Sequence, residues 1–203
     1  MATIVSTLFL SLDGVAEIDP AWHFPYFDEN MGAAVGADYE DVDVLLLGRV
    51  TYDSFAGAWP ERETAGGDDA AFAGQLGDVR KLVATRRAPG ADLGWRNVAA
   101  TDDVVTAVRE LRADDSIGKV LVAGSISVVQ QLLAAGVLDE LRLLVHPVVA
   151  GKGEQLFPRS EEPVPLRLVS SQAFPTGVTQ LVYSPAPFPG AAGYEDAAEN
   201  LPS

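Results

Sequence analysis

The chain has 203 residues, a formal net charge of −15 at pH 7 and 48% hydrophobic residues. This length is typical of one domain of roughly 100–200 residues, and the hydrophobic content excludes a generally disordered chain. The absence of cysteine excludes disulfides, thiolate metal sites and a cysteine nucleophile. The acidic charge argues against a nucleic-acid partner, which would require a basic face.

Nothing in the sequence points to a membrane or to a metal site. No apolar run approaches the ~20 residues of a membrane span. The apolar stretch at 3–12 has no basic residue before it and ends at Asp13, so it predicts a strand and not a signal peptide. Two isolated histidines are too few to suggest a metal site. We therefore expect a cytoplasmic protein.

Over the first half of the chain the patterns predict strands alternating with helices. Strands are expected at 3–12, 42–47 and 81–85, and loops at 18–25 and 59–67. Helices are expected at about 26–37, at 68–76 and from 101 to about 112, with a short helix opening after Gly48.

A buried strand at 120–123 leads through Gly124 into an amphipathic helix. Ser125 or Ser127 can cap this helix, and Ser127 has capping-box spacing to Gln130. A strand that enters a helix through a glycine turn leaves free backbone N–H groups at the positive end of the helix dipole. This turn is therefore the predicted site of a cofactor pyrophosphate.

Strands follow one another in the last part of the chain. They are expected at 141–149, 166–171 and 178–183, the last two as a hairpin. Residues 185–203 are rich in proline, glycine, alanine and acids, which predicts a disordered acidic tail. The whole pattern predicts one α/β domain over 1–184, with a mixed, mainly parallel twisted sheet flanked by helices and antiparallel C-terminal strands.

Several short motifs occur in the order of one known superfamily. They are S-L-D-G at 11–14, L-L-G-R-V-T-Y at 46–52, Thr85-Arg86 after a strand, V-A-G-S at 122–125, L-D-E-L at 138–141 and H-P-V-V-A-G-K-G-E-Q-L-F at 146–157. With these motifs the chain resembles the dihydrofolate-reductase-like superfamily, in the branch of the riboflavin-biosynthesis reductase domain and small stand-alone bacterial reductases. The resemblance implies an oxidoreductase that uses NADPH to reduce a small planar heterocycle, and a homodimer.

The resemblance also implies where the cofactor binds. It assigns the phosphates to the helix openings, the adenosine 2′-phosphate to the turn after the third strand, and the nicotinamide to a flexible loop at Gly14 and Val15. The cofactor-binding set is Gly14, Val15, Gly48, Arg49, Thr51, Thr85, Arg86, Arg87, Gly124, Ser125, Ile126 and Ser127. Arginine forms bidentate pairs with phosphate, although Arg86 and Arg87 could also serve only to solubilise a strand end.

Two departures from the family concern the substrate. Ala123 stands where the riboflavin branch usually has a glutamate, so a ribose-phosphate pyrimidine substrate is not expected. Asp28 lies one residue beyond the position of the pterin-binding carboxylate in dihydrofolate reductase, a helical rotation of ~100°. Asp28 is the candidate catalytic acid, and a solvated first helical turn is the alternative.

The remaining candidates are aromatic residues and histidines. Trp22, Tyr26 and Phe55 are expected to stack a planar substrate, with core packing as the alternative. His23 is expected to bind substrate or donate a proton, or else to be solvated, and His146 and Asp13 are expected to be structural. Two further functions remain open: a cofactor-binding protein without catalysis, and a flavin- or deazaflavin-dependent relative.

Overall fold

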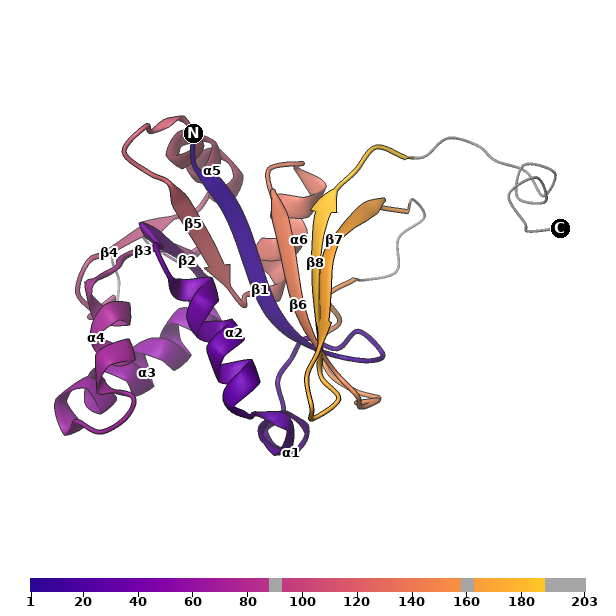
Figure 1. The fold of residues 1–203 in the computed structure, drawn as a ribbon. Helices are drawn as coiled ribbons and strands as arrows, with labels where there is room; N and C mark the ends of the chain where they lie inside the picture. Colours follow the sequence, from indigo (N-terminus) through magenta and orange to yellow (C-terminus); the bar gives the residue numbers. More distant parts are fainter. Residues whose placement is uncertain (88–92, 158–162, 189–203) are drawn as a thin grey trace, which may run out of the picture.

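The computed structural model describes residues 1–87, 93–157 and 163–188, and within them the strands form one eight-stranded sheet (Figure 1). The strands are β1 Thr3–Ser11, β2 Val44–Gly48, β3 Arg80–Ala84, β4 Val98–Thr101, β5 Lys119–Ala123, β6 Glu140–His146, β7 Leu166–Ala173 and β8 Thr179–Pro185. Their order is β4-β3-β2-β5-β1-β6-β8-β7, parallel from β4 to β6 and antiparallel beyond. The predicted fold class is confirmed.

Helices cover both faces of the parallel part of the sheet. They are α1 Pro20–His23, the 3-10 helix η1 Phe24–Tyr26, α2 Glu29–Tyr39, α3 Arg49–Ala65, α4 Ala70–Asp78, α5 Val104–Ala113 and α6 Ile126–Ala134. Figure 1 shows α2, α3 and α4 on one face, with α5 and α6 on the other. The apolar runs of the central strands follow from this arrangement, because residues of both orientations are buried.

Two core clusters lie on the opposite faces of the sheet. On one face Leu46 of β2 packs in the same cluster as Val108 of α5 and Leu132 of α6. On the other face Leu45 of β2 packs in a cluster with Tyr52 of α3. All five side chains are 0–1% exposed, and burial of each aliphatic one contributes roughly 1.5–3 kcal/mol.

Two predicted loops are wrong, since both segments contain helix. Residues 18–25 hold α1 and the start of η1, and α3 continues through Pro60 to Ala65. Proline usually interrupts a helix because it lacks an N–H group. Here the Trp59 ring packs at 5.3 Å from Phe72 of α4 and lies under the Arg62 guanidinium at 4.9 Å. These contacts stabilise the helix on both sides of the proline.

Lys81 of β3 is fully buried and closes the C-terminal end of α4. Its ammonium group donates to the carbonyls of Leu76, Gly77 and Val79 at 2.7, 2.9 and 2.8 Å. It also lies 4.4 Å from the centre of the Trp95 ring. These carbonyls have no partner within the helix, so Lys81 acts as the C-terminal cap. Burial lowers the pKa of Lys81 to about 8.

The C-terminal hairpin is longer than predicted, and β8 includes Pro185. The rest of the expected tail lies largely outside the described residues, which end at Phe188. The expected strand at 141–149 ends at His146, because Pro147 cannot donate a backbone hydrogen bond. In the described part of the chain, no helix has the length and apolar character needed to cross a membrane.

Candidate functional site

Three turns meet at the carboxyl edge of the sheet. β2 pairs in parallel with both β3 and β5, so the turns at 48–51, 85–87 and 124–127 follow neighbouring strands. The helices α3 and α6 begin in two of these turns. The first N–H groups of a helix have no acceptor within it, and the helix dipole adds positive charge there. This edge therefore presents two helix N-termini that can bind an anion.

Ser125 connects the two helix N-termini. Its hydroxyl accepts a hydrogen bond from the Gly48 N–H at 2.5 Å and donates to Oγ1 of Thr51 at 2.8 Å. The backbone of Ser125 is left-handed, with φ 67° and ψ 70°, and it follows a left-handed Gly124. Gly48 makes room for this contact, because a Cβ there would lie 3.0 Å from Ser125 and would force it to shift.

The predicted serine cap of α6 is wrong. No side chain caps this helix, because the Ser125 hydroxyl points back to Gly48. Ser127 and Gln130 form no capping box either, because the Gln130 amide donates instead to the carbonyls of Gln155 and Leu156. The Val128 N–H donates to the Ser125 carbonyl at 2.9 Å, so among the described residues the N–H groups of Ile126 and Ser127 are the ones left to another partner.

The predicted cofactor residues of α3 already have intramolecular partners. Nε of Arg49 lies 2.8 and 3.0 Å from the two carboxylate oxygens of Asp53, one turn along the helix. The Thr51 hydroxyl accepts from Ser125. An anion at this helix N-terminus would meet Arg49 together with the Asp53 carboxylate.

The turn after β3 carries the two adjacent arginines. Arg86 and Arg87 are exposed, and Thr85 is half-buried with its hydroxyl accepting from the Arg87 N–H at 3.2 Å. The first residue of β3, Arg80, lies at the opposite end of the same strand. The arginine pair thus places two cations at the edge where α3 and α6 begin.

The turn after β1 is held by hydrogen bonds to the loop that follows β6. Gly14, at φ 86°, accepts from the Leu156 N–H, and Val15 forms a β-bridge with Gln155 and is 2% exposed. The Asp13 carboxylate accepts from Ser11 and from two backbone N–H groups of that loop. The Ser11 bond is the largest cause that lowers the pKa of Asp13 to about 2. A structural Asp13 fits this geometry, and the flexibility expected at Gly14 and Val15 stays a prediction.

An aromatic–histidine cluster forms beside this turn. We define it as Phe9, Trp22, His23, Tyr26 and His146, whose ring centres lie 4.3–6.3 Å apart in contacting pairs. It joins the ends of β1 and β6 to α1 and η1. Three of the four predicted substrate-binding residues are therefore brought together at the carboxyl edge.

The fourth, Phe55, lies in a different part of the molecule. Its ring contacts Trp59 at 6.2 Å and packs in the core cluster around Leu45. This position fits the core-packing alternative.

The two histidines of the cluster contact each other and are buried. His23 is 5% exposed and His146 is 0% exposed, so a solvated His23 is wrong. Burial is the larger cause that lowers the pKa of His23 to about 4, and the electrostatic interaction with His146 is the second. Burial also lowers the pKa of His146, against hydrogen bonds with the backbone of Leu144 and Leu10 that raise it. Both rings are therefore neutral at neutral pH. The described residues contain no group of three or more potential metal-ligating side chains.

Asp28, the candidate acid, is the N-cap of α2. Its carboxylate accepts from the Met31 N–H at 2.9 Å and from the Asn30 amide at 3.1 Å. The Met31 bond is the main cause that lowers its pKa. A carboxylate in this state is ionised at neutral pH and is poorly suited to donate a proton.

Sequence reasoning missed an exposed apolar rim beside the cluster. Phe24 and Phe27 are 63% and 44% exposed, and Leu12 and Val149 are 67% and 68% exposed. A hydrogen bond from the Leu12 N–H to the Val148 carbonyl holds the two loops of this rim together. The motif F-P-Y-F at 24–27, directly after Trp22 and His23, is the sequence feature that could have predicted this rim.

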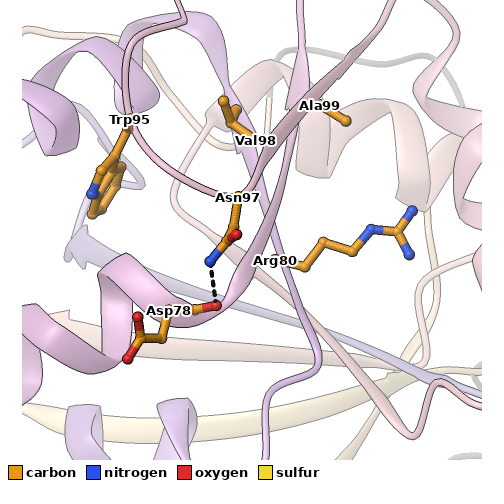
Figure 2. Close-up of a pocket in the computed structure, with 6 residues that line it drawn as sticks. All are labelled: Asp78, Arg80, Trp95, Asn97, Val98 and Ala99. Atoms are coloured by element: carbon orange, nitrogen blue, oxygen red, sulfur yellow. Dashed lines mark hydrogen bonds between the residues drawn. The ribbon is translucent and has the colours of Figure 1, made fainter.

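A hollow lies at the other end of the sheet. It has a volume of about 650 Å³ and is lined by Asp78, Arg80, Trp95, Asn97, Val98 and Ala99 (Figure 2). Arg80 and Val98 are the first residues of β3 and β4, so this hollow is at the amino ends of the strands. None of the predicted site residues lines it.

Comparison with solved structures identifies the fold. A putative riboflavin biosynthesis protein from Shewanella sp. PV-4 superposes with a TM-score of 0.71 at 20% identity, over 92% of this chain and all of that one. A pyrimidine reductase-like protein from Corynebacterium diphtheriae superposes with a TM-score of 0.64 at 16% identity, over 92% of this chain and 93% of that one. At these identities the likeness concerns the fold.

Sequence comparison gives the family. The uncharacterized protein YyaP of Bacillus subtilis is 27% identical over 187 residues, which are 89% of this chain and 93% of YyaP. Residues 2–180 match the model of the RibD C-terminal domain, which is nearly the whole of the sheet described above. This protein therefore belongs to the RibD C-terminal domain family, within the dihydrofolate-reductase-like superfamily.

Proposed function

We propose that the protein is an NADPH-dependent reductase that reduces a small planar heterocycle. The family implies a reductase-type function. The observation that carries the proposal is the pair of helix N-termini at the carboxyl edge, connected by the Ser125 hydroxyl. Two such N-termini, at the same sheet edge as three arginines in a chain of net charge −15, suit a ligand with more than one phosphate.

The residues at this edge fit a dinucleotide. Backbone N–H groups at the start of α6, together with the glycine at 124, allow a diphosphate to approach the main chain closely. Arg86 and Arg87 would bind an additional phosphate on the adenosine ribose, and this gives the preference for NADPH over NADH. NADPH supplies the hydride when bound.

The aromatic–histidine cluster fits the substrate side of the reaction. Its rings, with Phe24 and Phe27 at the rim, offer flat apolar surfaces on which a heterocycle can stack. The chain's part in the chemistry is then to orient the ring and to exclude water. With Asp28 serving as a helix cap, the proton comes from water or from the substrate itself.

Calorimetric titration with NADPH and with NADH tests the cofactor. We expect NADPH to bind more tightly, and the double variant Arg86→Ala/Arg87→Ala to lose about tenfold or more in NADPH affinity with little change for NADH. Arg80→Ala, at the other end of β3, is the matched control and should bind as the parent protein does. If neither nucleotide binds, the proposal is wrong.

A cofactor-binding protein without catalysis is the second candidate. The observation in its favour is Asp28, whose carboxylate caps α2 and has a lowered pKa. A flavin or deazaflavin phosphate would use the same helix N-termini. Substrate-dependent oxidation of NADPH, followed by absorbance across a panel of pteridines, pyrimidines and quinones, separates turnover from binding alone.

A further inference from the structure

The two histidines of the chain form one buried pair, although 123 positions separate them. Nδ1 of His23, at the end of α1, lies 3.2 Å from Nε2 of His146, the last residue of β6. The second nitrogen of His146, Nδ1, lies 3.1 Å from the carbonyl oxygen of Leu144. These three groups make a continuous chain of hydrogen bonds.

The chemistry of each group fixes the positions of the protons. A carbonyl oxygen only accepts, so Nδ1 of His146 must carry the proton that it donates to Leu144. The backbone of Leu10 is a second hydrogen-bond partner that favours a protonated nitrogen on this ring. A neutral imidazole has one N–H, so when Nδ1 carries the proton, Nε2 of His146 is an acceptor. Nδ1 of His23 must then donate to it, and Nε2 of His23 keeps an unshared electron pair.

This Nε2 atom is the end of the hydrogen-bonded chain, and it has no partner in the part of the protein that the structure describes. It makes no hydrogen bond with the described residues, and it is not among their fully buried polar atoms that lack a partner, so it is not completely enclosed. The rest of the His23 ring is enclosed, since the residue is 5% exposed. A buried ring therefore presents a single acceptor atom to a ligand.

The surroundings of His23 favour a flat ligand. Phe9, Phe24 and Phe27 lie with their ring centres 4.3, 5.1 and 5.7 Å from that of His23, and Trp22 lies at 6.3 Å. Phe24 and Phe27 also belong to the exposed rim. A ligand that reaches Nε2 would pass between apolar ring faces, where an unmatched hydrogen-bonding group is costly.

We propose that Nε2 of His23 is a hydrogen-bond acceptor that selects planar heterocycles bearing an N–H or amino donor, and that His146 is the positioning residue that fixes this state. The Leu144 carbonyl determines which nitrogen of His146 carries the proton, and His146 in turn determines which nitrogen of His23 carries it. The inference rests on the proposed function for the reaction that follows binding, and it narrows the substrate class to ring systems with a donor edge.

Nitrogen NMR of isotope-labelled, ligand-free protein tests the proton positions directly. The chain holds two histidines, so two imidazole spin systems are expected, and both should carry the proton on Nδ1 at neutral pH. His146→Gln keeps an acceptor for His23 and should preserve its Nδ1–H state. His146→Leu removes that acceptor, and His23 should shift toward Nε2–H. A proton on Nε2 of His23 in the parent protein would overturn the proposal.

Binding of two small probes tests the selectivity. We expect isocytosine, a pyrimidine with ring N–H and amino donors, to bind about tenfold more tightly than dimethoxypyrimidine, which has no donor. His23→Phe keeps a ring in place and should abolish this difference, whereas Phe24→Leu, at the exposed rim, should retain it. The proposal fails if the two probes bind equally, if neither binds, or if His23→Phe keeps the difference. Neither measurement uses NADPH, so failure of the cofactor titration would leave this result standing.

Discussion

Ser125 adopts a left-handed backbone conformation that places its hydroxyl between Gly48 and Thr51. We expect Ser125→Ala to lower the free energy of unfolding by about 1–3 kcal/mol, because the Gly48 N–H loses its acceptor and the strained backbone remains. Ser125→Gly loses the same bond but relieves the strain, so its cost should be smaller. Urea denaturation measures both, and exposed Ser127→Ala is the control. Equal stability of Ser125→Ala and Ser127→Ala would contradict the bridging role.

His23 should have a measurable effect on how the free energy of unfolding depends on pH. An unfolded chain protonates this ring near its ordinary pKa of 6.5, but the folded chain does so only at about 4. Between these pH values the unfolded state binds more protons, so the free energy of unfolding should fall as the pH is lowered from 6.5 toward 4. His23→Gln/His146→Gln should show a flatter profile in this window. An unchanged slope in the double variant would mean that other titratable groups cause the loss of stability at low pH.

Among the elements, β3 and α4 depend on one buried cation. Replacing Lys81 by Met keeps most of the side-chain volume but leaves the carbonyls of Leu76, Gly77 and Val79 without their donor. We expect a loss of about 2–4 kcal/mol in the free energy of unfolding, measured by denaturation. Lys152→Met, at an exposed position, is the matched control and should change stability little. A loss no larger than that of the control would mean that water can cap α4 equally well.

Elements with a strong local pattern were predictable, and those that depend on distant contacts were not. The continuous apolar runs of β2 and β5 indicate burial on both faces without further information. The helix through Pro60 depends on the packing of Trp59 against α4, which no local pattern contains.

The same distinction applies to the candidate site. The glycine turn at 124 was predictable as a helix N-terminus. The bridge from Ser125 to Gly48 spans 77 positions, and the contact of His23 with His146 spans 123. Such pairs become visible only when the order of the strands is known.

At the scale of the whole molecule, the two edges of the sheet differ. β4 has four residues, whereas β7 has eight, of which seven are exposed. The edge strand β7 carries no acidic residue in a chain of net charge −15, and Leu168 and Val169 are each 50% exposed. A strand edge that the described residues leave exposed in this way is a template for pairing with another strand.

We propose that two copies of the chain associate through β7. Sedimentation at micromolar concentration should give twice the mass of one chain, and the dimer should strengthen with added salt, which screens the repulsion between two acidic chains. Val169→Asp should yield the monomer, whereas the same change at exposed Val50, in the first turn of α3, should leave the dimer intact. A monomeric parent protein would contradict this proposal.

The Ser125 hydroxyl couples the N-termini of α3 and α6, so both helices should respond when an anion binds there. α3 packs on one face of the sheet and α6 on the other, yet their N-termini share this one hydroxyl at the sheet edge. An anion bound there would restrain both helical layers together. Amide hydrogen exchange should therefore slow in α3 and in α6 with the same concentration dependence, although the sheet lies between them.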